Sequence, residues 1–176
     1  MKTNIALIGF MGAGKTAIGK LLAKKLGRKF IELDALIEQL AGKPIPEIFE
    51  QDSEIAFREL EIEATKQVAL EQNVVIAGGG GIVLNKINID RLRESSRVVY
   101  LTASPGILLK RVSGGKNERP LLNVSDQALQ ISELLRFRKP FYQRAADITI
   151  NTSKLDIDSV TEHIIDKLKQ DESFHF

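Results

Sequence analysis

The residues of this chain that most clearly suggest chemistry lie near its amino terminus. Residues 9–16 read GFMGAGKT and fill every fixed position of the pattern GxxxxGKS/T. Glycines in this pattern let backbone N–H groups approach phosphate oxygens, and the start of the following helix adds partial positive charge. Lys15 is expected to reach the β- and γ-phosphates, and the Thr16 hydroxyl to ligate Mg²⁺ directly. The pattern predicts that a nucleoside triphosphate binds here, and it leaves the phosphoryl acceptor open.

Two carboxylates, Glu32 and Asp34, come at the end of the second apolar run. Alternation along a strand would put both on the same side, facing the phosphate-binding loop. One could hold the water ligands of Mg²⁺, and the other could accept the proton of the acceptor hydroxyl. Asp34 also precedes a helical pattern, so a purely structural role as its N-cap is the alternative.

Glycines and arginines supply the remaining candidates. The glycine run at 78–81 costs backbone entropy, so close approach of a ligand to bare N–H groups explains it better than a sharp turn alone. Arg58 lies in a helical pattern, Arg119 in a polar and glycine-rich stretch, and Arg138 near Pro140. Each arginine could neutralise an anion, although taken singly each could also be a solvated surface residue.

These side chains need a framework that brings them together. Apolar runs of strand length alternate with helical patterns, which predicts a parallel sheet covered by helices on both faces. Ligands of such sheets bind at the carboxyl ends of the strands, where the candidate residues fall. The expected strands are 5–8, 30–33, 74–77, 98–101 and 148–150, and the expected helices are 16–26, 35–40, 53–71, 86–93, 105–112, 125–145 and 156–170.

Length and composition limit the possible functions. The 176 residues are typical of one domain, here 1–170, followed by a tail at 171–176 that we expect to be frayed. The absence of cysteine excludes disulfides, thiolate catalysis and zinc–cysteine sites. A formal net charge of +2 indicates neither a nucleic-acid nor a membrane partner, and no apolar run approaches the length of a membrane span. We expect a cytoplasmic monomer.

Considered together, the motifs are much more specific than any one of them. With this set the chain resembles the shikimate kinases over nearly its whole length. The matching elements, in order, are the loop at 9–16, Asp34, Phe57-Arg58-x-x-Glu61, the triple glycine at 79–81, Arg119-Pro120-Leu121-Leu122 and Arg138-x-Pro140-x-Tyr142.

The resemblance implies both a fold and a reaction. The implied fold is an α/β P-loop kinase, with a five-stranded parallel sheet sandwiched by helices and a mobile lid at about 113–123. The implied reaction is ATP-dependent phosphorylation of the 3-hydroxyl of shikimate, which gives shikimate 3-phosphate and ADP (EC 2.7.1.71). It is a step in the biosynthesis of chorismate and the aromatic amino acids, and it uses one Mg²⁺ per subunit.

The resemblance also implies residue roles. Lys15, Asp34 and Arg119 would be catalytic, with Asp34 as the candidate base and Arg119 in the lid. A segment at about 34–61 would form the substrate-binding region. Shikimate would be bound by Asp34, Arg58, Gly79, Gly80, Gly81 and Arg138, and ATP by Gly12, Ala13, Gly14, Lys15, Thr16, Ala17 and Arg119.

Two departures from the family pattern limit these expectations. The family usually has Asp-x-Asp after the second strand, and Glu32 takes the first of these positions here. Because its side chain is longer by about 1 Å, we expect Glu32 to reach Mg²⁺ through water. The family's adenine contact falls near residues 151–155, and no matching arginine occurs there, so no residue of this chain is assigned to adenine.

Other functions remain open at this stage. Another small-molecule P-loop kinase, such as a gluconate kinase or a nucleoside monophosphate kinase, is the nearest alternative. A GTP-dependent switch or a nucleotide-binding module without transfer activity is the alternative from a different class. The guanine-binding pattern Asn-Lys-x-Asp is absent, because residues 85–88 lack its final aspartate.

Overall fold

The computed structural model describes residues 2–114 and 126–176, in which five parallel strands form one sheet in the order β2-β3-β1-β4-β5. The inner strands β1 and β3 are buried along their whole length, as a sheet covered on both faces requires, whereas the edge strands β2 and β5 carry polar and partly exposed residues. This arrangement confirms the predicted α/β fold with a five-stranded parallel sheet. The strands are β1 (Asn4–Ile8), β2 (Lys29–Glu32), β3 (Val74–Ala77), β4 (Ser96–Thr102) and β5 (Ile148–Asn151).

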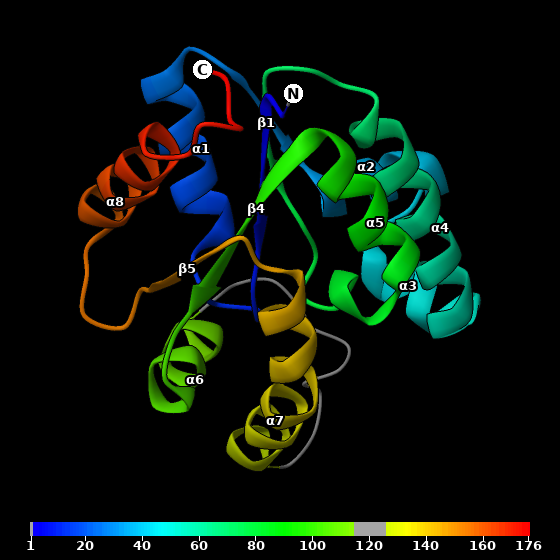
Figure 1. Cartoon of the computed structure of the whole chain (residues 1–176). Helices are drawn as coiled ribbons and strands as arrows, with labels where there is room; N and C mark the ends of the chain where they lie inside the picture. Colours follow the sequence, from blue (N-terminus) through cyan, green and yellow to red (C-terminus); the bar gives the residue numbers. More distant parts are fainter. Residues whose placement is uncertain (1, 115–125) are drawn as a thin grey trace.

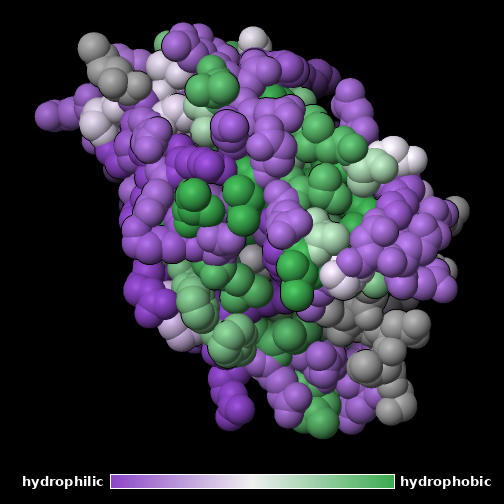
Figure 2. Space-filling model, turned by 90° about the vertical axis from the view of Figure 1, so that its right-hand side faces the viewer, coloured by the Kyte–Doolittle hydropathy of each residue, from purple (hydrophilic) through white to green (hydrophobic). Residues whose placement is uncertain are grey.

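Helices cover both faces of this sheet. In Figure 1, α1 (Lys15–Leu26) and α8 (Ile157–Lys169) lie on one side, and α2 (Leu33–Ala41), α3 (Ile45–Gln51), α4 (Ser53–Ala69) and α5 (Lys86–Ser95) lie on the other. Beyond the carboxyl ends of β4 and β5 lie α6 (Pro105–Ser113) and α7 (Gln127–Ala145). On the side over α2 to α5, hydrophobic residues are interspersed among hydrophilic ones, as in a helix layer that faces water (Figure 2).

Alternation along β1 divides the core into two parts. Ile5 and Leu7 face α1 and α8 and belong to one buried cluster, whereas Ala6 and Ile8 face the opposite helix layer and belong to the other. All four side chains are at most 1% exposed. The central strand is therefore fixed from both faces, and the loop that follows it starts from a rigid support.

Most element boundaries differ from the predictions by one or two residues, and two differences affect the site. The second strand ends at Glu32, and Leu33 opens α2 with no intervening loop. Helix α3 was not predicted at all. Pro44 and Pro46 argued against a helix here, because proline disrupts a helix interior. In the structure Pro44 is the N-cap and Pro46 lies in the first turn, where a backbone N–H would have no partner within the helix.

The carboxyl-terminal tail corrects another expectation. Residues 171–176 were expected to be frayed, yet Phe174 is buried in the α1 and α8 side of the core at 5% exposure. The N–H of His175 donates to the Lys2 carbonyl at 3.0 Å, and the Arg28 guanidinium lies 5.1 Å from the Phe174 ring centroid. Burial of one aromatic side chain, supported by these contacts, holds the tail beside the residues that precede β1.

None of the helices in the described ranges 2–114 and 126–176 combines the length and apolar character that a membrane crossing requires.

Candidate active site

A cavity of about 860 Å³ opens at the carboxyl ends of the central strands. It lies where parallel sheets of this kind bind ligands. Twelve of the fourteen residues predicted to form the site line this cavity. The two exceptions are Ala13, which is buried, and Arg119, which lies outside the described residues with most of the expected lid. The twelve are Gly12, Gly14, Lys15, Thr16, Ala17, Glu32, Asp34, Arg58, Gly79, Gly80, Gly81 and Arg138.

The loop between β1 and α1 forms one wall of the cavity. Gly14 precedes the helix with φ of +99°, a left-handed conformation that a side chain would strain. The Lys15 ammonium donates to the carbonyls of Gly9 at 2.8 Å and Phe10 at 3.0 Å, so it lies over the loop rather than in the core. The loop and the start of α1 thus have the backbone conformation that the predicted phosphate cradle would need.

The end of β2 meets the start of α1 beside this loop. The Thr16 hydroxyl donates to Glu32 Oε1 at 2.5 Å. Glu32 is therefore next to the residue that the sequence predicts to be a direct Mg²⁺ ligand. A hydroxyl and a carboxylate are both hard oxygen donors, as a site for this ion requires.

Asp34 is placed differently from the way strand alternation predicted. It is the second residue of α2, so it does not continue the strand that ends at Glu32. The N-cap position belongs to Glu32, which makes no side-chain capping bond, so the N-cap alternative for Asp34 is wrong. A Cβ atom built on Gly79 would lie 3.0 Å from Asp34 Oδ1 and 3.1 Å from Glu61 Oε2. The glycine thus admits two carboxylates to this edge of the cavity.

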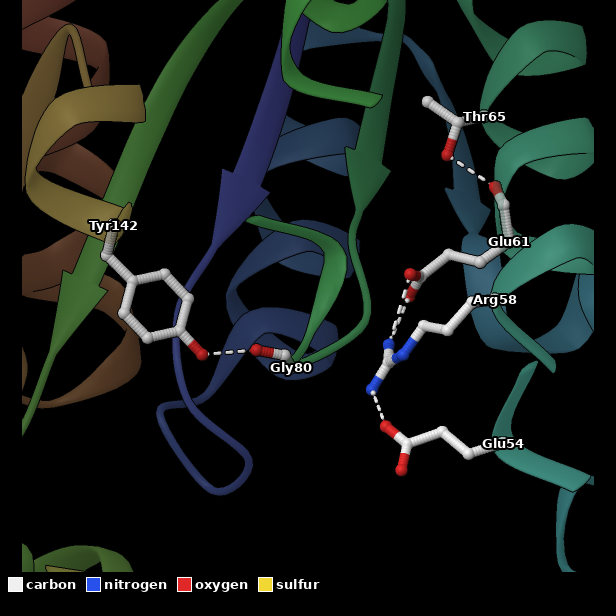
Figure 3. A network of polar contacts seen from close by, with 6 residues as sticks. All are labelled: Glu54, Arg58, Glu61, Thr65, Gly80 and Tyr142. Carbon is white, nitrogen blue, oxygen red and sulfur yellow. Dashed lines mark hydrogen bonds and ion pairs between the residues drawn. The ribbon is translucent and has the colours of Figure 1, made fainter. Parts of the chain in front are cut away.

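Arg58 is held in the cavity by two carboxylates of its own helix (Figure 3). Its Nη1 donates to the Glu61 oxygens at 3.1 and 3.3 Å, and its Nη2 donates to Glu54 at 3.1 Å. The Arg58 side chain is only 18% exposed, so the alternative of a solvated surface arginine is wrong. A Cβ atom on Gly81 would lie 2.6 Å from both terminal nitrogens, so a side chain there would displace the guanidinium from this position.

Glu61 is fully buried beneath this arginine. Burial raises the pKa of the Glu61 carboxyl above its ordinary value, and the positive charge of Arg58 opposes that shift. The negative charge of Asp34 raises the same pKa further. Glu61 was noticed in the sequence only as part of a motif, and no role was predicted for it.

Arg138 and Tyr142 approach the cavity from α7. They are one helical turn apart and therefore share a face. Both are buried, at 2% and 0% exposure, and the Tyr142 hydroxyl donates to the Gly80 carbonyl (Figure 3). The Arg138 guanidinium lies 5.9 Å from the Phe10 ring centroid, next to the phosphate-binding loop. Arg138 is thus a buried cation at the junction of the loop and the glycine turn.

Sequence reasoning missed a contact at the other end of the loop. Arg111 at the end of α6 donates from Nη1 to the Gly12 carbonyl at 3.1 Å and from Nη2 to the Thr152 carbonyl at 3.0 Å. The Thr152 hydroxyl donates in turn to the Ala13 carbonyl at 3.2 Å. The signals in the sequence were the position of Arg111 at the end of a helical pattern and that of Thr152 directly after the last strand.

Comparisons with known proteins agree with this geometry. Residues 11–169 match the family model described as shikimate kinase. The chain is 46% identical to the shikimate kinase of Caldanaerobacter subterraneus, covering 92% of this chain and 94% of that protein. It is 44% identical to the shikimate kinase of Moorella thermoacetica, covering 96% of each. The chain belongs to the shikimate kinase family.

A solved structure supports the same assignment. The shikimate kinase of Acinetobacter baumannii, determined in complex with shikimate, superposes with a TM-score of 0.93 at 35% identity, over 98% of this chain and 96% of that one. The activity is shikimate kinase activity, the ATP-dependent phosphorylation of the 3-hydroxyl of shikimate (EC 2.7.1.71). This reaction is a step in chorismate and aromatic amino-acid biosynthesis. The family assignment therefore excludes the alternatives left open by the sequence, which were a P-loop kinase with another acceptor, a GTP-dependent switch and a nucleotide-binding module without transfer activity.

Proposed function

We propose that ATP and shikimate meet in the one cavity described above, with ATP on the loop between β1 and α1 and shikimate between the glycine turn, α2, α4 and α7. The observation that carries this proposal is that Lys15, Asp34, Arg58 and Arg138 line the same cavity. A kinase gains much of its rate by holding donor and acceptor in line, which a shared cavity allows.

On the acceptor side, Arg58 and Arg138 bind the shikimate carboxylate, together with backbone N–H groups of Gly79, Gly80 and Gly81. A guanidinium pairs with a carboxylate through two parallel hydrogen bonds, which fixes orientation as well as position. Both arginines are already desolvated, at 18% and 2% exposure, so their pairing with an anion is little screened by water.

Asp34 contacts the acceptor hydroxyl. A loose phosphoryl-transfer transition state depends more on the position of the nucleophile than on its full deprotonation. Asp34 therefore aligns the 3-hydroxyl toward the γ-phosphate and takes up its proton as the bond to phosphorus forms. Placement in the first turn of α2 gives this carboxylate a rigid support.

On the nucleotide side, Lys15 moves from the carbonyls of Gly9 and Phe10 to the phosphates of ATP. Charged phosphate oxygens accept from an ammonium more strongly than neutral carbonyls do. Gly12, Ala13, Gly14, Thr16 and Ala17 supply N–H groups around the phosphates. Arg119 remains the candidate that neutralises charge from the lid.

The donor set near the phosphates fits Mg²⁺. This ion usually takes one or two protein oxygens and fills its remaining positions with waters and substrate phosphates. Thr16 and Glu32 would hold it, Thr16 directly and Glu32 through water. Within residues 2–114 and 126–176 no group of three or more His, Cys, Asp or Glu could hold a metal alone, which agrees with a site completed by ATP. When bound, the ion neutralises phosphate charge.

Replacing either Arg58 or Arg138 with lysine tests the acceptor side. Lysine keeps the charge but lacks the planar fork, so the KM for shikimate should rise about tenfold or more, while the KM for ATP changes little. Arg136→Lys is the control, because Arg136 is exposed on the same helix as Arg138. The measurement is steady-state ADP production with each substrate varied in turn. An increase confined to the KM for ATP would contradict the assignment.

The cytoplasmic location and the monomeric state expected from the sequence are kept as proposals. Dependence on ATP supports the first. Gel filtration at several protein concentrations tests the second, and a mass that doubles with concentration would contradict it.

A further inference from the structure

We propose that Tyr142 is a positioning residue for the acceptor, and that its hydroxyl fixes the peptide between Gly80 and Gly81 in the orientation that presents an N–H to shikimate. This proposal rests on the acceptor site described under Proposed function. No role for this tyrosine follows from the phosphate-binding loop, the arginines or Asp34.

The first step concerns how the glycine turn is held. The Gly78 N–H donates to the Leu7 carbonyl at 2.9 Å. A short 3₁₀ helix, η1 (Ile82–Leu84), follows the turn, and the N–H groups of its first and last residues donate to the carbonyls of Gly79 at 3.3 Å and Gly81 at 3.0 Å. These bonds lie within the turn or tie its base to β1. Among the described residues, the Gly80 carbonyl instead accepts from a side chain of a different element, Tyr142 of α7. Tyr142 thus ties the tip of the turn to the rest of the fold.

The second step concerns the geometry of a peptide. The carbonyl of Gly80 and the N–H of Gly81 belong to one planar trans unit, and in such a unit they point in opposite directions. Because the carbonyl points to Tyr142, the Gly81 N–H points away from α7. Arg58 lies beside Gly81 on the α4 side, as its 2.6 Å distance from a built Cβ shows. Within residues 2–114 and 126–176, no hydrogen-bond partner is found for this N–H.

The third step concerns what the turn would do without the hydroxyl. Glycines on both sides place no steric limit on rotation of this peptide, so two orientations are accessible at similar cost. One orientation presents the N–H to the acceptor and the other presents a carbonyl, which repels a carboxylate. A single hydrogen bond from a rigid neighbour is enough to select the first.

Tyr142 is well suited to that task. Its ring is completely buried and stacks on Tyr100 of β4, with centroids 4.9 Å apart and planes inclined by 16°. Burial also raises the pKa of the Tyr142 hydroxyl far above its ordinary value. The hydroxyl therefore stays protonated and keeps donating at any pH at which the enzyme works.

The test compares Tyr142→Phe with the wild type in steady-state kinetics. Loss of one hydrogen bond should raise the KM for shikimate about three- to tenfold, while kcat and the KM for ATP stay close to wild type. Tyr100→Phe removes the other hydroxyl of the same buried stack and should leave the KM for shikimate unchanged. Replacement of Tyr142 by p-aminophenylalanine restores a donor and should restore a low KM.

Other outcomes overturn the proposal. An unchanged KM for shikimate in Tyr142→Phe, or an equal increase in Tyr100→Phe, would show that the hydroxyl is only structural. A lower melting temperature without a selective effect on shikimate would do the same. Arg138→Lys distinguishes failure of this proposal from failure of the proposed acceptor site. If Arg138→Lys raises the KM for shikimate and Tyr142→Phe does not, the acceptor site is supported and the role of Tyr142 is wrong. If neither variant changes the KM, both are wrong.

Discussion

The two sides of the cavity proposed above, one for the nucleotide and one for the acceptor, are built in different ways. The nucleotide side comes from one continuous segment, residues 9–17, and relies on backbone groups and the end of one helix. The acceptor side takes Asp34 from α2, Arg58 from α4, the glycine turn after β3 and Arg138 from α7. Phosphates are similar in all nucleotides, so a local backbone cradle is sufficient for them. A small asymmetric acid requires side chains that converge from several directions.

A second difference is how each side is held in place. On the nucleotide side, Lys15 contacts carbonyls of its own loop, and Arg111 and Thr152 donate to the Gly12 and Ala13 carbonyls. This side is therefore held mainly through the backbone carbonyls of one loop. On the acceptor side, Arg58 depends on Glu54 and Glu61, and the glycine turn depends on Tyr142. Changes on the nucleotide side should therefore affect catalysis directly, whereas many changes on the acceptor side should act through a supporting residue.

The largest effect is expected on the nucleotide side. Lys15→Ala should lower kcat about 10²- to 10³-fold, because it removes a charge that stabilises the transition state. Circular dichroism should show an intact fold, since the ammonium lies over the loop. Lys20→Ala, an exposed lysine of the same helix, should keep full activity. A folded Lys15→Ala protein with near wild-type ADP release would contradict the role.

The next effect separates two carboxylates that are two residues apart in the sequence but serve different sides. Asp34→Asn should lower kcat about 10²-fold, the low end for acid–base groups, since orientation contributes more than proton transfer. Glu32→Ala should instead raise the Mg²⁺ concentration needed for half-maximal rate, and Glu32→Asp should not. The measurement is the reaction rate as a function of Mg²⁺ and of shikimate concentration for each variant. If Asp34→Asn changed only the Mg²⁺ dependence and Glu32→Ala only the dependence on shikimate, the two assignments would have to be exchanged.

A smaller effect tests the fit between the glycine turn and Arg58. In Gly81→Ala the new methyl group would lie 2.6 Å from both terminal nitrogens of Arg58, so the guanidinium must move. We expect the KM for shikimate to rise about tenfold and the KM for ATP to stay unchanged. Gly106→Ala in α6 is the matched control, because a Cβ atom there meets nothing within 4 Å. Equal effects of both substitutions would argue against a specific contact.

The smallest effect is on stability. The folded protein binds the Glu61 proton more tightly than the unfolded chain does, because burial raises the Glu61 pKa above 4.5. As pH rises above 4.5, Glu61 loses its proton in the unfolded chain while it still keeps the proton in the folded protein. Over the interval between 4.5 and the raised pKa of the folded protein, the free energy of unfolding therefore falls. The advantage of wild type over Glu61→Gln in urea unfolding should shrink across this interval, by about 1.4 kcal/mol per unit of pKa shift.

Glu59→Gln controls for the loss of a charge at an exposed site on the same helix. A wild-type advantage over Glu61→Gln that stayed constant with pH would show that the buried carboxylate does not titrate differently in the two states. The acceptor side would then carry no stability cost from Glu61.

Sequence patterns were sufficient wherever the structure is local. The loop at 9–16, the five strands and most helices follow from apolar periodicity and from glycines at fixed spacing, since these depend on neighbours a few residues away. The conjunction of motifs also identified the family. The errors fall at α3, where two prolines hid a helix, and at the tail, where one buried phenylalanine decided the outcome.

Only the tertiary structure decided how the acceptor side is supported. No spacing rule connects Tyr142 to Gly80 across 62 residues, or Arg111 to Gly12 across 99. Nor could strand alternation place Asp34, because α2 begins one residue before it. The sequence by itself determined the residues that carry charge and the cradle for phosphate. The partners that hold those charges depend on which helices pack together, and packing is a property of the whole fold.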